Sequence, residues 1–192
     1  MVELLAVITV IVILSLLAMP AFRSISGGNS ITSGGLLVSG QLELARQTAL
    51  AEGIQTEVRF YKIAGNTGLE AYRAMALVKV STGEMLNKTQ RLPEGVILSD
   101  NPVFSTILSN DNMDEGTQDL PGLPNTPYKS LRFTNGGSTT LNPLGAGSGA
   151  SRDQWFVSVK AESAPEENNL PARNYSTVQV DPITGRTTIF RP

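Results

Sequence analysis

Five acidic side chains fall within residues 99–128, a stretch that contains no Lys or Arg. Clustered oxygen ligands are what Ca²⁺ binds, so a calcium site is one interpretation. The spacing does not match the EF-hand template, which needs ligands at alternate positions and a glycine at the sixth. We therefore favour a solvated surface loop, with calcium as the alternative. Four of the five acidic residues are the candidate calcium ligands, and the fifth, Asp100, is not among them. The candidates are Asp111, Asp114, Glu115 and Asp119.

Two missing residue types exclude much catalytic chemistry. The 192-residue chain contains no cysteine and no histidine, and it therefore has no disulfide, thiolate nucleophile or imidazole base. The glycine-rich segment 145–149 lacks the GK[ST] ending of a phosphate-binding loop. The formal net charge of -2 argues against nucleic-acid binding, which needs a basic face. These features predict a protein that is not an enzyme and that has no cofactor.

Another informative carboxylate is Glu3, which stands directly before a long apolar run. Residues 4–22 carry no charge, and their only polar side chains are Thr9 and Ser15. As a helix this run would rise about 28 Å, close to the hydrocarbon thickness of a bilayer. We therefore predict a transmembrane or filament-core helix over residues 1–25. A secretory signal peptide is disfavoured, because no basic residue precedes the run and no good cleavage site follows it.

Glu3 itself has two interpretations. A carboxylate at the edge of an apolar helix is costly unless it has a favourable partner. The partner can be the positive N-terminal end of the helix dipole. It can instead be the α-amino group of a neighbouring copy, in which case the charge would set the register of assembly within the membrane.

Residues 26–53 are predicted to continue the helix as an amphipathic segment. Within residues 36–52, one face at spacings of four, three and four carries small and medium apolar residues, and Gly53 is a natural stop. Glycine weakens a helix, so residues 26–30 and 34–35 are soft points. Two alternatives are open: the helix passes through them, or it breaks and restarts at Thr32 or Ser33. The apolar face consists of Val38, Leu42, Ala45 and Ala49.

Residues 54–192 are predicted to form a β-rich head domain. Short stretches of alternating or β-branched residues are separated by turn signals rich in Gly, Asn and Pro. A hairpin is expected where residues 131–134 and 138–141 flank Asn135-Gly136-Gly137. One long helix followed by many short strands predicts an α+β fold with an antiparallel sheet. The other expected strands cover residues 54–63, 72–80, 96–98, 155–159, 175–180 and 186–190.

The N-terminal segment resembles that of type IV pilins and type II secretion pseudopilins. The resemblance rests on Glu3, on the aliphatic run after it and on Pro20, which matches the helix-kinking proline of the family. It implies a pilin-like fold in which the helix packs on the sheet. It also implies a basic leader removed by a prepilin peptidase and an N-terminal methylated phenylalanine a few residues before Glu3. The expected assembly residues are Glu3, Leu4, Leu5, Val7, Ile8 and Pro20.

Three further segments resemble the H-type minor pseudopilins. They are the helical Ala45–Ala49 stretch, the Phe133–Gly137 segment and the turn around Thr184-Gly185-Arg186. The C-terminal sequence Val178–Arg186 and the strand residues Val58–Tyr61 are most similar to the Verru_Chthon cassette protein D group. Many major pilins have a C-terminal disulfide that this chain cannot form, which favours a minor subunit.

The predicted function is a structural subunit of a type IV pilus-like or type II secretion pseudopilus filament. The resemblance implies a bacterial inner-membrane protein, with one pass and a periplasmic head, that later enters a periplasmic or extracellular filament. Its partners would be other pilin or pseudopilin subunits, membrane lipid before assembly, and an assembly ATPase with its platform. The alternative is a monomeric, single-span anchored β domain that binds a ligand or a cell-envelope component.

Overall fold

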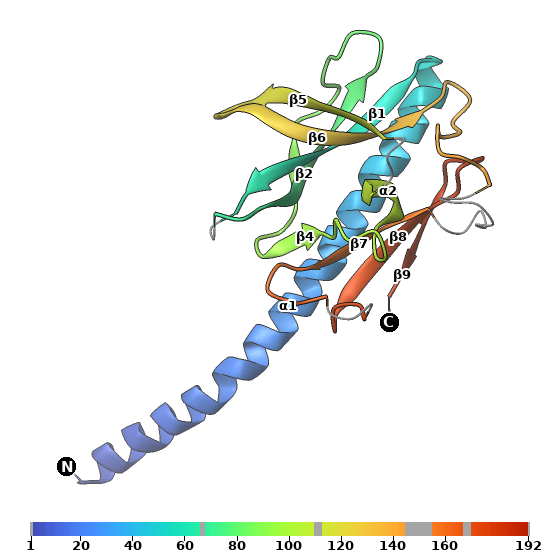
Figure 1. Cartoon of the computed structure of the whole chain (residues 1–192). Helices are drawn as coiled ribbons and strands as arrows, with labels where there is room; N and C mark the ends of the chain where they lie inside the picture. The colour runs from blue at the N-terminus through green and yellow to red at the C-terminus, as the bar shows by residue number, and fades with distance from the viewer. Residues whose placement is uncertain (1, 66–67, 110–112, 145–154, 167–169, 192) are drawn as a thin grey trace.

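The computed structural model has one long helix followed by a nine-stranded sheet (Figure 1). It describes residues 2–65, 68–109, 113–144, 155–166 and 170–191, apart from the side chains of residues 2, 5 and 16–27. The elements in chain order are α1 (Val2–Glu52), β1 (Thr56–Ala64), β2 (Glu70–Lys79), β3 (Gln90–Arg91), β4 (Val96–Leu98), α2 (Thr106–Ser109), β5 (Asp114–Leu120), β6 (Leu123–Phe133), β7 (Phe156–Ala161), β8 (Tyr175–Val180) and β9 (Thr187–Phe190).

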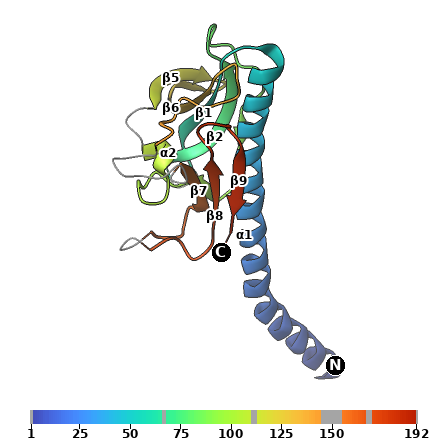
Figure 2. The same cartoon turned by 90° about the vertical axis from the view of Figure 1, so that its right-hand side faces the viewer.

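The strands form a single antiparallel sheet in the order β5-β6-β1-β2-β4-β7-β8-β9, with β3 paired to β2. The C-terminal half of α1 crosses one face of this sheet and contacts strands from β6 on one side to β9 on the other (Figure 2). The predicted α+β class, with a helix packed on an antiparallel sheet, is confirmed.

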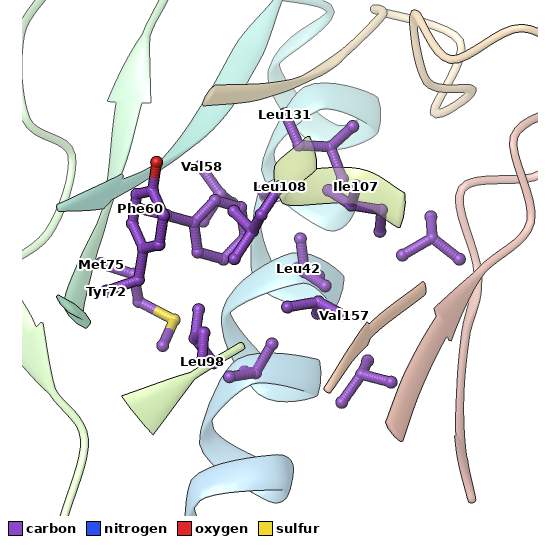
Figure 3. Close-up of a cluster of buried hydrophobic side chains, with 14 of the residues drawn as sticks. Leu42, Val58, Phe60, Tyr72, Met75, Leu98, Ile107, Leu108, Leu131 and Val157 are labelled. Atoms are coloured by element: carbon purple, nitrogen blue, oxygen red, sulfur yellow. The ribbon is translucent and has the colours of Figure 1, made fainter. Parts of the chain in front are cut away.

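The helix buries the face that its sequence period predicts. Val38, Leu42, Ala45 and Ala49 are all fully buried. They belong to the main core, in which Leu42 lies among Val58, Phe60 and other residues of the sheet (Figure 3). Gly53 ends the helix with a φ of 64°, a left-handed conformation that glycine adopts without strain.

The glycines of α1 do not interrupt the helix, so the break at Thr32 or Ser33 is absent. Gly34 and Gly35 are buried and let the helix come close to the sheet. A Cβ atom on Gly35 would lie 2.5 Å from the Oγ of Ser176, and one on Gly34 would lie 3.0 Å from Val159. These glycines are therefore close-packing positions, a role that their low helix propensity alone does not indicate.

A smaller cluster lies on the opposite face of the sheet. Tyr61, Ile63 and Leu120 pack there around two small residues of β2, Ala74 and Ala76. Both alanines are nearly fully buried, but they project only one methyl group each from the middle of the strand. This face is therefore less filled than the helix-covered face, where β2 contributes Met75 and Leu77.

The prediction of a surface loop over residues 99–128 is wrong. This stretch includes α2, all of β5 and the first half of β6. The β5–β6 hairpin lacks apolar alternation because polar pairs hold it: Asp114 pairs with Arg132 at 2.6 Å and Glu115 with Lys129 at 2.8 Å. Cross-strand charge pairs stabilise such a ribbon without a hydrophobic face.

The predicted hairpin at residues 131–141 is present only in part. The chain turns back, with Thr134 N donating to the carbonyl of Ser138 at 2.8 Å. The second strand, however, is reduced to a single bridge between Phe133 and Thr139. Thr139 N instead donates to the carbonyl of Pro182 at 2.9 Å, so this segment is drawn toward the β8–β9 turn.

Candidate assembly site

The N-terminal part of α1 forms an apolar arm that extends away from the sheet (Figures 1 and 2). We define the arm as residues 3–15, whose described side chains are all exposed. Leu4, Val7 and Ile8 are exposed by 68%, 58% and 50%. Their spacing of three and four residues places them on one face of the helix. An exposed apolar surface of this extent marks an interaction site rather than an ordinary protein surface.

Polar groups on the arm are few and are partly satisfied by the helix itself. The hydroxyl of Ser15 donates to the carbonyl of Ile11 at 2.8 Å. Such i−4 bonding lets a hydroxyl enter apolar surroundings without an unpaired donor. Glu3 is exposed in the first turn, where the helix dipole favours a carboxylate. Its pairing with another copy stays a prediction.

The transmembrane prediction is not confirmed. Within the part of the chain that the structure describes, no helix has both the length and the apolar character that a membrane crossing needs. The predicted span over residues 4–22 includes Leu5 and residues 16–22, whose side chains lie outside that description. Pro20 belongs to this undescribed set, so its predicted role in assembly stays a prediction.

A clamp of three chain segments fixes the other half of α1 to the head. Arg46 donates through Nε to the carbonyl of Thr184 in the β8–β9 turn, at 2.7 Å. The same guanidinium pairs with Glu43 one turn earlier on the helix, at 3.0 Å. The pairing orients the arginine, so that a charged donor meets a turn carbonyl from a distant part of the sequence.

Gly185 lies at the centre of this clamp. Its φ is 66°, and a Cβ atom there would lie 2.1 Å from the carbonyl oxygen of Gly137 and 3.2 Å from both Arg46 and Phe133. Gly137 in turn adjoins Leu50 of the helix. The three segments of the H-type resemblance therefore meet at one place in space. Their spacing in the sequence did not predict this contact.

The proposed calcium ligands do not form a metal site in the described residues, and Asp111 lies outside them. Asp114 and Glu115 are paired with Arg132 and Lys129 across the β5–β6 hairpin. One carboxylate oxygen of Asp119 accepts a hydrogen bond from the backbone N of Asn125 at 2.8 Å. No group of three or more His, Cys, Asp or Glu that could hold a metal ion occurs in that part of the chain.

A buried polar network supports the hairpin instead. Glu57 is 3% exposed and pairs with Arg59, with which it shares one face of β1. Arg59 also donates to Gln118 of β5 at 2.8 Å and stacks on the Tyr128 ring at 4.4 Å. A buried carboxylate needs such partners, because an unpaired charge in the interior is expensive. The support of the hairpin and the pairing of Glu57 therefore explain why these polar residues are buried.

Two tyrosines of the head are held in their neutral form. Burial raises the pKa of Tyr61 to about 12, although Arg59 opposes the change. Burial also raises the pKa of Tyr72 to about 12, with Glu115 and Asp100 adding to the shift. Both groups stay protonated at neutral pH and do not supply a base there.

Comparison with protein-family models and with curated proteins finds no match. Among solved structures, the chain is similar to the minor pseudopilin EpsH from the Type 2 Secretion System of Vibrio cholerae. The identity is 13% and the TM-score 0.44, over 85% of this chain and 98% of that chain. A similarity this low assigns no function. The finer resemblance to the Verru_Chthon cassette protein D group stays a prediction.

Proposed function

We propose that this chain is a structural subunit of a pilus-like or pseudopilus filament that assembles through its N-terminal helix. The carrying observation is the arm: a helical segment with every described side chain of residues 3–15 exposed, mostly aliphatic, and with a single carboxylate at its start. Apolar surface of this kind gains free energy when it leaves water. The arms of other subunits are the partners that this proposal assigns.

The clamp supports the same proposal from the head side. In a filament, pulling forces on the arm and forces from its lateral contacts would be transmitted to the head through α1, which is one uninterrupted helix. The bond from Arg46 to Thr184 and the close contact at Gly185 hold that helix against the sheet. A rigidly held helix presents its arm at a fixed angle to the head, which a regular filament requires.

Within this proposal the subunit first resides in the bacterial inner membrane with its head in the periplasm. A prepilin peptidase and an assembly ATPase with its platform would process and move it. Glu3 would neutralise the N-terminus of a neighbouring subunit, a favourable pairing because a lone charge among apolar helices is expensive. No catalysis is assigned to the head.

The test compares the two ends of α1. We expect Glu3→Ala to abolish or disorder filaments in the sheared envelope fraction, imaged by electron microscopy with an antibody to the head. Glu52→Ala, which removes an exposed carboxylate from the other end of the same helix, should leave them intact. Normal filaments with Glu3→Ala would contradict the role of Glu3. A single-span anchored β domain predicts no filaments with any variant, including the unaltered chain.

A further inference from the structure

A cleft of about 720 Å³ lies on the face of the sheet that α1 does not cover. Its volume is within the range of small-molecule sites. The floor comes from Ile63 and Ala74, one wall from Met85 and Leu86 after β2, and the other from Leu120 at the tip of the β5–β6 hairpin. It exists because Ala74 leaves the middle of β2 nearly empty on this face, where larger side chains would have filled the space.

The charged residues that line the cleft are both basic. The lining includes Lys88 and Arg91 and contains no Asp or Glu. Both basic side chains are exposed, and in the described ranges neither forms an ion pair. An apolar hollow with cations at its rim and no carboxylate in its lining complements a molecule that is apolar at one end and anionic at the other.

The wall that carries these cations is tethered rather than loose. Asn87 accepts a hydrogen bond from the backbone N of Leu77 at 2.8 Å and donates to Gln41 of α1 at 2.7 Å. Leu86 N also donates to the carbonyl of Leu77 at 2.8 Å. A site whose wall is held in this way needs little ordering when a ligand binds.

We propose that this cleft binds an aliphatic chain with an anionic head group. The apolar lining consists of Ile, Ala, Met, Leu and Pro with no aromatic ring, so it favours methylene groups over flat rings. Arg91 offers the planar fork that matches a carboxylate or a phosphate, and Lys88 adds a second positive charge. A fatty acid and a phospholipid share this chemistry. The proposal is independent of filament assembly.

The test uses methionine methyl resonances in the full chain, held in a nonionic amphipol. Of the five methionines, Met85 lines the cleft and Met75 is fully buried in the core beneath α1. With ¹³C-methyl methionine, we expect octanoate or dihexanoyl phosphatidate to shift the Met85 resonance saturably and to leave Met75 in place. The probe that binds more tightly identifies the class of ligand: octanoate stands for a single-chain carboxylate, and dihexanoyl phosphatidate for a phospholipid. Octanol should bind at least about tenfold more weakly, because it lacks the charge.

A charge-reversal variant provides the control. Lys88→Glu/Arg91→Glu should raise the dissociation constant for the anionic probes at least about tenfold. Arg173→Glu/Arg186→Glu, at two exposed arginines outside the cleft, should not change it. The proposal is overturned if the Met85 shift does not saturate, if octanol binds as well as octanoate, or if both double variants behave alike. If the Met85 resonance shifts when only the protein concentration is raised, another copy of this chain occupies the cleft. That result would also overturn the proposal.

Discussion

Along α1, every described side chain of residues 3–15 is exposed, whereas Val38, Leu42, Ala45 and Ala49 are fully buried against the sheet. The C-terminal half follows the rule for a helix of a folded domain, with one apolar stripe facing the core. The arm is aliphatic on all sides and finds no such core within the described chain. One half of the helix is therefore packed on the sheet of its own chain, whereas the arm has no core to pack on within the described residues. For this reason our proposal assigns the packing partner of the arm to other subunits.

The largest expected difference between the halves is in stability. Leu42→Ala should lower the free energy of unfolding of the head by about 2–5 kcal/mol, because it leaves a cavity beneath the helix. Leu14→Ala, at a residue 61% exposed, should change it by no more than about 0.5 kcal/mol. Urea unfolding followed by the fluorescence of Trp155, the single tryptophan and a buried residue, measures both. Equal losses would mean that the arm packs on the head.

A pair of glycines sharpens the comparison within the buried half. Gly35→Ala should destabilise the head by about 1–3 kcal/mol, because its Cβ would lie 2.5 Å from the Ser176 hydroxyl. Gly40→Ala should stabilise it by about 0.5–1 kcal/mol, because nothing lies near that position and alanine favours the helix. The same urea titration measures the free energy of unfolding of both variants. A stabilising Gly35→Ala would contradict the close approach of helix and sheet.

The last predicted effect appears only in alkali and is confined to the head. Tyr61 and Tyr72 have pKa values raised to about 12 in the folded protein, above the value of 10.0 for an unperturbed tyrosine. Their contribution to stability is full below pH 10 and is lost as the pH rises toward 12, where the unfolded chain binds fewer protons than the folded one. Tyr72→Phe should make this decline shallower in unfolding curves at successive pH values. An unchanged slope would contradict the shift assigned to Tyr72.

Sequence periodicity predicted the regions in which burial alternates regularly. The helix stripe through Leu42 and the strands β1, β2, β7, β8 and β9 follow from periods of 3.6 and 2. The β5–β6 hairpin was missed because polar pairs such as Glu115 with Lys129 hold it and leave no apolar alternation to read. The close packing at Gly34 and Gly35 was not predicted, because helix propensity takes no account of a neighbouring strand.

The candidate site was predictable to a different extent in its two parts. The arm is visible in the sequence as an uncharged run after Glu3, since apolar composition needs no knowledge of the fold. The clamp is not visible in this way, because Arg46 and Thr184 are brought together only by the path of the whole chain. Similarly, Asp114 was a candidate metal ligand in the sequence, whereas the fold pairs it with Arg132 of the neighbouring strand.

The most direct measurement of the central claim is cross-linking from a single cysteine on the arm, since the natural chain has none. Ile11→Cys, at an exposed arm position, should give a covalent dimer with a bismaleimide in intact envelopes, because one thiol per subunit can link two subunits at most. Leu170→Cys, at an exposed position in the head, should stay largely monomeric, and Glu3→Ala should remove the Ile11→Cys dimer. The account is contradicted if Ile11→Cys remains monomeric, or if its yield of covalent dimer is no higher than that of Leu170→Cys.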